Sequence, residues 1–430
     1  MRAKQIFAGI LISSMLLSTG SGCSKKAKTT SNISTIEQSG SGNAIYELSS
    51  AKSSKDKSKD MDLDHAYLEF ALGLIRRCAQ KAGKENFMVS PDSVLFALGM
   101  TAAGADGETL DQMLGALLPG MDKEEAFLFA VDRMDQIESK QLHIGNSIWI
   151  NDSYKPSVYS NYLKYVEQKF GAQINSIPFN NSGTDQINSW VDINTNGMIP
   201  KMVDHLSADQ VMILINALAF DAKWEDKFKS NDVTEDRFHA DSFSTAETAT
   251  FLWGEGDVTY LSNQTAQGFY KTYKGGKYAF MTILPYDYDI DINEYVANMT
   301  ADDYMCFWYN TYHPETKYCF PEFTAEYSTS LNETLKDMGM ADAFNSDTAN
   351  FGNMADIHPL FISEVIQSTK IEVDADGTKA SAATKVTMEH NGPGGATGKK
   401  EVKCNRPFAY AIVDVETGLP IFFGTVEHVT

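Results

Sequence analysis

A long run of alternating residues near the C-terminus constrains the fold more than any other feature of this sequence. From Thr378 to Met388 every second residue is small or apolar, and the residues between them, from Lys379 to Glu389, are mostly polar. Such alternation predicts a β-strand with one buried face, because successive side chains of a strand point to opposite sides. At about 3.3 Å per residue the run would span roughly 40 Å, which is long for a strand.

Residues that permit a change of direction flank this run on both sides. Gly377 lies between two extended stretches, and glycine tolerates most backbone angles, so the chain could pivot there. Turn-forming residues, from His390 to Pro393, follow the run. By itself the pattern is compatible with an ordinary hairpin strand that has Gly377 as a bulge. The small residues at the start of the run also fit a strand that inserts between existing strands.

The remaining pattern mixes helices with strands. Residues 64–80 predict an amphipathic helix with Leu68, Leu72 and Ile75 on one stripe. A second helix is expected to begin at Ser90-Pro91, with serine as the N-cap and proline at the first helical position.

Strand-like patterns occupy His143–Ile150, Val211–Phe220, Lys277–Pro285 and Ile421–Val426. The second of these is apolar enough to be buried on both faces. Because helices and strands do not alternate in a βαβ rhythm, the predicted class is α+β.

The N-terminus has the layout of a secretory signal. Arg2 and Lys4 precede an apolar stretch, residues 6–17, and small residues lead to Cys23. We expect a signal peptide over residues 1–22 and lipid attachment at Cys23; the alternative is an ordinary cleaved signal with an incidental cysteine.

Residues 23–60 are rich in Ser, Lys, Thr and Gly and predict a flexible tether to a folded domain over 61–430. The expected location is outside the cytoplasm, in the cell envelope or beyond it.

Charge and cysteine spacing narrow the classes of function. The net charge of −21 disfavours binding to nucleic acid or to anionic lipid, so a membrane would be reached only through the lipid anchor. Four further cysteines match no zinc spacing, and either disulfides or buried thiols would account for them: Cys78, Cys306, Cys319 and Cys404. We find no catalytic motif and expect no cofactor, no metal and no enzyme activity.

Several sequence blocks resemble the serpin family in the family's order, over about residues 64–429. They are NFMVSPDSVLFALGMTAAGADGETLDQM, INSWVDINTNGMIPKMVD, VMILINALAFDAKWEDKF, FPEFTAEYSTSLNETLKDMGMADAF, FISEVIQSTKIEVDADGTKASAA and NRPFAYAIVDVETGLPIFFGTV. The resemblance implies the serpin fold, with about eight or nine helices around three β-sheets and an exposed reactive loop. It also implies a monomer that inhibits a serine protease, or a cysteine protease.

The resemblance assigns roles to particular residues. The hinge of the loop would comprise Gly377, Thr378, Ala380, Ser381, Ala382 and Ala383. Residues beneath and at the top of the opening sheet, the shutter and the breach, would be Ser90, Ser93, Asn216, Gln367 and Trp224. Two positions depart from the family. Ala375 stands where a glutamate is usual, and Gln367 replaces a histidine and would bridge Ser and Asn side chains.

The implied mechanism is that of a suicide substrate. A protease cleaves the loop, and the freed hinge inserts into the main sheet while the acyl-enzyme is still attached; loop insertion of this kind is an established form of strand addition. The native state would be metastable. The expected scissile bond is Asn391-Gly392, with Met388, Glu389, His390 and Lys385 as alternatives. Two rival functions remain: a non-inhibitory serpin that binds a partner or serves as a protease substrate, and an unrelated surface adhesin.

Overall fold

The computed structural model describes residues 57–240, 246–378 and 398–429, with side chains from residue 63 onward. These ranges contain nine α-helices and three short 3-10 turns (155–157, 230–232 and 342–344). The helices are α1 (Lys57–Ala82), α2 (Pro91–Ala102), α3 (Gly107–Leu117), α4 (Lys123–Ile137), α5 (Ser160–Phe170), α6 (Asn181–Asn194), α7 (Ile292–Ala297), α8 (Ala301–Tyr309) and α9 (Asn332–Asp337). In the described part of the chain, none of them is both long and apolar enough to cross a membrane.

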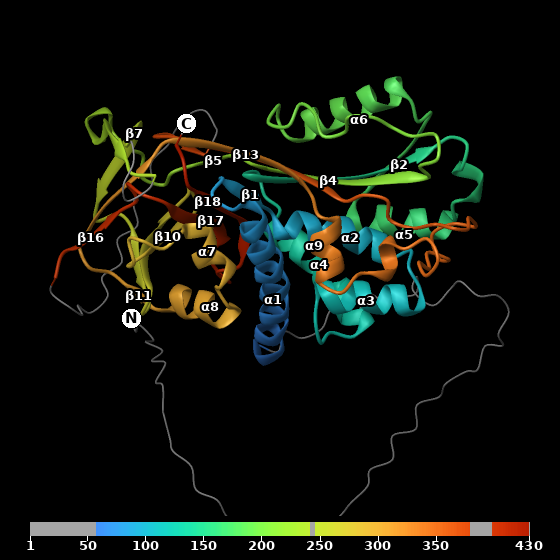
Figure 1. Cartoon of the computed structure of the whole chain (residues 1–430), viewed down its shortest axis with the longest axis horizontal. Coiled ribbons are helices and arrows are strands. Elements are labelled where there is room, and N and C mark those ends of the chain that lie inside the picture. Colours follow the sequence, from blue (N-terminus) through green and yellow to red (C-terminus); the bar gives the residue numbers. More distant parts are fainter. Residues whose placement is uncertain (1–56, 241–245, 379–397, 430) are drawn as a thin grey trace, which may run out of the picture. The chain divides into compact units, whose positions relative to one another are not determined.

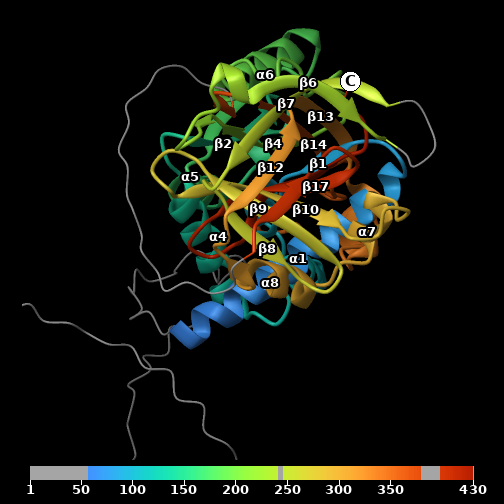
Figure 2. The ribbon, with the colours of Figure 1, turned by 90° about the vertical axis from the view of Figure 1, so that its left-hand side faces the viewer.

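The strands form four hydrogen-bonded sheets. The largest has, in spatial order, β1 (Phe87–Val89), β18 (Pro420–Val426), β17 (Phe408–Asp414), β10 (Tyr278–Pro285), β9 (Ala266–Thr272), β8 (Thr259–Ser262) and β11 (Thr311–Tyr312). A second contains β16 (Lys400–Lys403), β12 (Thr316–Pro321), β7 (Glu247–Glu255) and β6 (Val233–Phe238). Figure 2 looks onto the end of the molecule where these two sheets lie.

The other two sheets are halves of one larger sheet. One half has the order β3 (Gln173–Ile177), β2 (Leu142–Asn151), β4 (Met212–Phe220). The other has the order β13 (Phe323–Ser330), β14 (Ile366–Val373), β15 (Gly377–Thr378), β5 (Ala222–Lys223). Because β4 and β5 are separated only by Asp221, the chain carries one half directly into the other (Figure 1). Counted in this way, the α+β fold has the three sheets expected.

Local sequence patterns explain where the helices form. The predicted stripe of α1, Leu68, Leu72 and Ile75, is buried, although the helix begins at Lys57, before the expected boundary of the tether. The Ser90 hydroxyl caps α2 by accepting the backbone N–H of Ser93 at 3.3 Å, as predicted. All four predicted strands are present, as β2, β4, β10 and β18.

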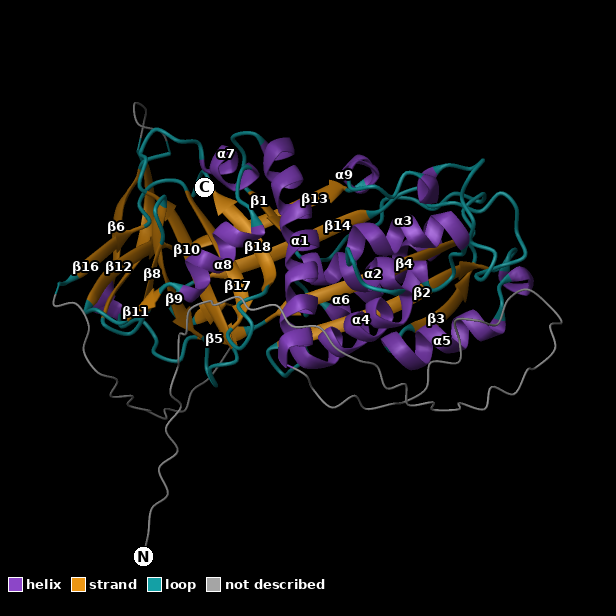
Figure 3. Ribbon diagram, turned by 90° about the horizontal axis from the view of Figure 1, so that it is seen from below, coloured by secondary structure: helices purple, strands orange, loops and turns teal. Residues whose placement is uncertain are grey.

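Helices cover the half-sheet that contains β4 on both faces. Figures 1 and 3 show α6 on one face of β2 and β4, and α2 packs against the other. The last six residues of β4 are buried on both faces, as expected, but its first three, Met212 to Leu214, are only half-buried. That part of the strand therefore borders a space that the protein does not fill.

A buried ion pair fixes α2 under this sheet. Arg133 of α4 donates two hydrogen bonds of 3.0 Å to Asp92 of α2, and both side chains are almost fully buried. Asp414 of β17 lies 3.8 Å away, and the ring of Tyr67 in α1 lies under the guanidinium at 5.2 Å. Because a buried charge is costly unless it is paired, this cluster ties α1, α2, α4 and β17 to one another.

Candidate functional site

The chain reverses direction between β14 and β15, and this reversal places the predicted hinge inside a sheet. Thr378 pairs antiparallel with Val373 of β14 on one side and with Ala222 of β5 on the other. Gly377 pairs with Lys223. Because both edges of β15 are hydrogen-bonded, this segment is an inner strand and not the outer strand of a hairpin.

Gly377 is required by its backbone conformation and by its surroundings. Its φ angle is +153°, a region that residues with side chains rarely adopt. A Cβ atom at this position would lie 2.3 Å from the carbonyl oxygen of Ala222 and 2.5 Å from the Cα of Lys223. The pivot expected from the sequence is therefore also the point at which the backbone presses against β5.

An aspartate caps the turn between β14 and β15. The Asp374 Oδ1 atom accepts the backbone N–H groups of Asp376 at 2.8 Å and Gly377 at 3.0 Å. Lys227 donates to Asp376 at 2.6 Å, and this bond holds the pKa of the Asp376 carboxyl below its ordinary value. The acidic residues beside the hinge thus act as caps and ion-pair partners of the turn.

Glu322 lies next to Ala375, the position at which serpins usually have a glutamate. Its Oε1 atom accepts the backbone N–H of Ala375 at 3.0 Å. Burial raises the pKa of Glu322, the hydrogen bond from Ala375 opposes this shift, and the neighbouring Asp374 adds to it. A glutamate at position 375 would add a carboxylate next to Glu322 and Asp374, and alanine avoids that repulsion between like charges.

Trp224 and Tyr273 support the hinge from the core. The indole Nε1 of Trp224 donates to the Asp374 carbonyl at 2.8 Å, and the Trp224 backbone N–H donates to the Asp376 carbonyl at 3.2 Å. The Trp224 ring stacks on Tyr273, with 4.6 Å between centroids. The hydroxyls of Tyr273 and Thr378 are 2.8 Å apart, and both residues are fully buried. Thr378 therefore already occupies a strand position.

A buried lysine lies among the same aromatic rings. The Lys271 ammonium ion pairs with Asp257 and lies 4.9 Å from the centroid of Phe228, 5.8 Å from that of Tyr318 and 5.9 Å from that of Trp224. Burial lowers the pKa of Lys271, and the Asp257 carboxylate opposes that shift. The ammonium fixes the rings that hold the hinge through cation–π attraction.

A cavity of about 620 Å³ lies between β4 and β14, at the parts of these strands that are distant from β15. Met212 to Asn216 line one side of it, and Val365 to Gln367 line the other. Ser93 of α2 lies on its wall. An inserting strand that continued from β15 between β14 and β4 would therefore enter this cavity.

The polar groups on the two sides of this cavity do not hydrogen bond to one another, and one of them has no partner in the part of the chain that the structure describes. Asn216 donates to the Asn146 side chain at 2.9 Å, and its own Oδ1 atom has no partner among the described residues. Gln367 donates to the Ser90 carbonyl at 2.8 Å and accepts from the Ser90 N–H at 3.2 Å. The expectation that Gln367 bridges Ser and Asn side chains is therefore wrong for this state, because both of its amide groups bind the Ser90 main chain.

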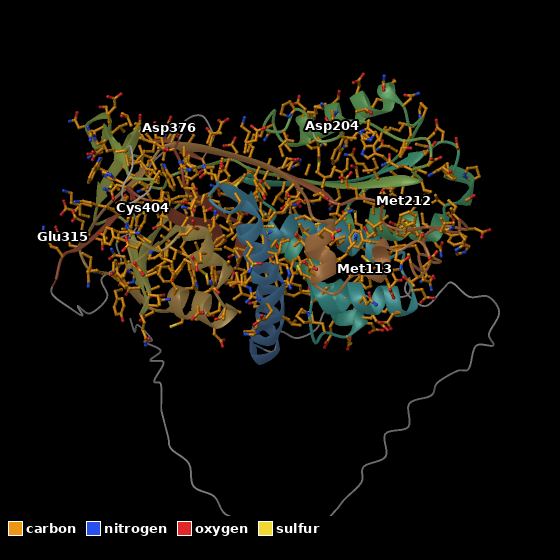
Figure 4. The ribbon with its side chains drawn as sticks, in the orientation of Figure 1. Met113, Asp204, Met212, Glu315, Asp376 and Cys404 are labelled. Atoms are coloured by element: carbon orange, nitrogen blue, oxygen red, sulfur yellow. The ribbon has the colours of Figure 1, made fainter. Side chains whose placement is uncertain are left out.

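The chain after the loop returns at β16, which pairs in parallel with β12. Lys399 forms exposed ion pairs with Glu315 at 2.9 Å and Glu255 at 3.4 Å. In Figure 4, Asp376 marks the hinge end of the loop and Glu315 lies beside its return. Both ends of the loop thus lie within the half of the molecule that carries β7 and β16.

Several predicted site residues lie outside the described residues. They are Cys23, Ala380, Ser381, Ala382, Ala383, Lys385, Met388, Glu389, His390, Asn391 and Gly392. Their assigned roles stay predictions. Sequence reasoning missed Tyr273, Glu322, Lys227 and Asn146, because each contacts the hinge or Asn216 across long sequence separations and no local pattern marks it.

The cysteines of the described residues are thiols. Cys78, Cys319 and Cys404 are buried and Cys306 is exposed. Of the two possibilities left open by the sequence, unpaired thiols are the one observed. Among the described residues, no group of three or more His, Cys, Asp or Glu side chains is arranged to hold a metal ion.

Comparisons with known proteins agree with this geometry. The family model described as "Serpin (serine protease inhibitor)" matches residues 65–429. An uncharacterized serpin-like protein of Thermococcus kodakarensis is 28% identical over 372 residues, which are 85% of each chain. The alpha-1-antiproteinase of Rattus norvegicus is 27% identical, over 83% of this chain and 87% of that one.

Among solved structures, the thermophilic serpin tengpin in its native state superposes with a TM-score of 0.77. It is 36% identical, and the match covers 88% of this chain and 96% of tengpin. With a family model that spans the described fold and a relative of this identity, the chain belongs to the serpin family.

Proposed function

We propose that this protein inhibits a protease by inserting its cleaved reactive loop between β14 and β4. The observation that carries the proposal is β15. Its two residues already pair with β14 and β5, and an open cavity lies farther along β14 and along β4, the strand that leads into β5. The sequence after Thr378 is small and alternating, as an inserting strand requires.

The register of β15 predicts how far insertion would proceed. Thr378 is opposite Ala222 and Val373, so continued pairing would bring Thr384 opposite both Asn216 and Gln367. Its hydroxyl could then join the two side chains, which do not now bond to each other, and donate to the Asn216 Oδ1 atom, which has no partner within the described ranges. Met388 would lie opposite Met212, where β4 begins. This limit agrees with a scissile bond near Asn391-Gly392.

The free energy of insertion would come from new strand pairing and from burial of the small alternating face. About ten residues would join the sheet, each with a net hydrogen-bond contribution of about 1 kcal/mol. The uncleaved protein must therefore be held in its native state kinetically. The protease would supply the catalytic groups, and the serpin would supply the conformational change.

The test is to incubate the chain lacking residues 1–23 with a panel of serine and cysteine proteases. We expect a covalent complex that survives boiling in detergent, with cleavage between Met388 and Gly392. The cleaved protein should unfold at a much higher temperature than the intact one. Cleavage without a complex and without this gain in stability would leave a serpin that binds a partner or acts only as a substrate.

We also propose that the protein is exported and anchored through Cys23. The proposal rests on the signal layout of residues 1–22 and on the tether that follows. Growth with labelled palmitate should label the wild type but not Cys23→Ser. A released, unlabelled wild-type protein would contradict the anchor and favour an ordinary cleaved signal.

A further inference from the structure

Exposed tyrosines gather at one corner of the molecule. Among the described residues eight large apolar side chains are exposed, and four of them are tyrosines of this corner: Tyr286, Tyr288, Tyr309 and Tyr312. Figure 3 shows the strands of the corner, β8, β11 and β16, at the same end of the molecule. Exposed aromatic residues are unusual on a solvated surface and are enriched in protein interfaces.

Contacts among these residues show that they form one patch. Tyr312 of β11 pairs directly with Tyr260 of β8. Burial and then the neighbouring Tyr286 side chain raise the pKa of Tyr260 to about 12. Asn310, which follows Tyr309, accepts the Tyr312 hydroxyl at 2.8 Å and donates to the Ser262 carbonyl.

One cation lies against the exposed ring of Tyr288, and another lies against the buried ring of Tyr260. The Arg406 guanidinium lies 4.1 Å from the centroid of Tyr288 and donates to the Pro285 carbonyl. The Lys400 ammonium lies 5.4 Å from the centroid of Tyr260. Rings that are already fixed lose little conformational entropy when a partner binds, which favours their use in recognition.

The position of Lys400 indicates which partner would reach the patch. Lys400 begins β16, where the chain returns from the reactive loop. The candidate cleavage positions, Lys385 to Gly392, precede it by 8 to 15 residues, which span roughly 25 to 50 Å at full extension. A protease domain is of similar size, so a protease bound at the loop is within reach of this corner.

We propose that the tyrosine patch, formed by the exposed Tyr286, Tyr288, Tyr309 and Tyr312 around the buried Tyr260, is a second contact surface for the protease that cleaves the loop. This inference rests on the proposed function in one respect only, that a protease attacks the loop. It assigns part of the specificity to the body of the protein. The loop sequence would select the bond, and the patch would select among proteases that can cleave it.

The test compares loop cleavage in three proteins: the wild type, the triple variant Tyr286→Ser/Tyr288→Ser/Tyr312→Ser, and the control Tyr159→Ser. Tyr159 is also exposed but lies at the start of α5, at the opposite end in Figure 1. The probes are a chymotrypsin-type elastase, a glutamyl endopeptidase and an asparagine-specific cysteine endopeptidase. A synthetic peptide of residues 379–398 reports the activity of each protease without the patch.

With at least one probe we expect the triple variant to lower the second-order rate constant of loop attack by about tenfold or more. The control variant should match the wild type, and peptide cleavage should be unchanged. Equal rate constants for the triple variant and the control with all three probes would overturn the proposal. Dimerisation of the wild type that the triple variant abolishes, with unchanged rate constants, would instead assign the patch to self-association.

The outcome is separable from that of the proposed function. Loop attack is measured as the sum of complex and cleaved product, so the patch is tested even if no covalent complex forms. Patch-dependent cleavage without a complex would refute inhibition and keep the contact surface. Complex formation that does not depend on the patch would support inhibition and refute the contact surface.

Discussion

The two ends of the reactive loop are held in different ways. The hinge end, from Asp374 to Thr378, is fixed by hydrogen bonds within its turn, to the partly buried Glu322 and to the buried Tyr273, and Thr378 is fully buried. The return end is fixed by four parallel strand pairs between β16 and β12 and by the exposed ion pairs of Lys399. The end that would insert is held by side-chain hydrogen bonds that reach the buried core, and the end that would stay is held by strand pairing and by exposed ion pairs.

This difference agrees with what each end has to do in the proposed mechanism. The hinge contacts are formed in the native state and would persist after insertion, because the turn from β14 into the new strand remains the same turn. These contacts hold the residues from which the inserted strand would extend. The return end only has to restrain the loop until it is cut. Changes at the hinge end should therefore have the larger effects.

The largest effect is expected for Thr378→Arg. A guanidinium cannot be buried beside Tyr273 without a partner, so the hinge would leave its position between β14 and β5. The yield of covalent complex should fall by about tenfold or more, while cleavage of the loop continues. Quantifying complex and cleaved product on denaturing gels checks this. Thr378→Ser keeps the hydroxyl and is the matched control, and equal yields from both variants would contradict the assignment.

The next effect is expected for Ala375→Glu, which restores the residue usual in the family. Its carboxylate would face Glu322 and lower the stability of the native state by about 1–2 kcal/mol. Chemical unfolding at neutral pH measures the change. Ala375→Gln has a similar size and no charge. If the two variants are equally stable, repulsion by Glu322 does not explain why alanine stands here.

A smaller effect is expected for Glu322→Gln, and it depends on pH. The pKa of Glu322 is raised in the folded protein, so the fold favours its protonated carboxyl, and this contribution to stability is lost as the pH rises through the folded pKa. The glutamine keeps an oxygen for the Ala375 N–H and removes this loss. We expect the variant to be more stable than the wild type above about pH 5, by less than about 1 kcal/mol because the carboxyl is partly exposed.

Unfolding temperatures of Glu322→Gln and the wild type between pH 4 and pH 8 provide the measurement. The two curves should converge at the acidic end, where both side chains are neutral. Glu322→Ala removes the acceptor and should be less stable than both. A constant difference between Glu322→Gln and the wild type over the whole range would show that the charge of Glu322 has no role at the hinge.

The smallest effect is expected for Lys399→Ala at the return end. Its ion pairs with Glu315 and Glu255 are exposed and screened by salt, so the unfolding temperature should change by less than about 2 °C. Repeating the measurement in 1 M salt should remove even that difference. A loss as large as that of Ala375→Glu would show that the two ends are not held as differently as the structure indicates.

The sequence by itself determined the features that depend on local pattern. The stripe of α1, the Ser90 cap of α2, the strands β2, β4, β10 and β18 and the pivot at Gly377 were all predicted, because each follows from periodicity, capping chemistry or the freedom of glycine. The order of six sequence blocks was enough to identify the family. The resemblance also indicated which residues would lie near the opening sheet.

Only the tertiary structure decided how those residues are paired. Gln367 binds the Ser90 main chain and Asn216 binds Asn146, although the sequence suggested one shared network. Glu322 meets Ala375 across 53 positions, and the tyrosine patch joins residues of separate strands and loops. Such contacts depend on the distances between packed elements, which no local pattern encodes, and the cavity is lined by strands from both halves of the sheet, β4 and β14.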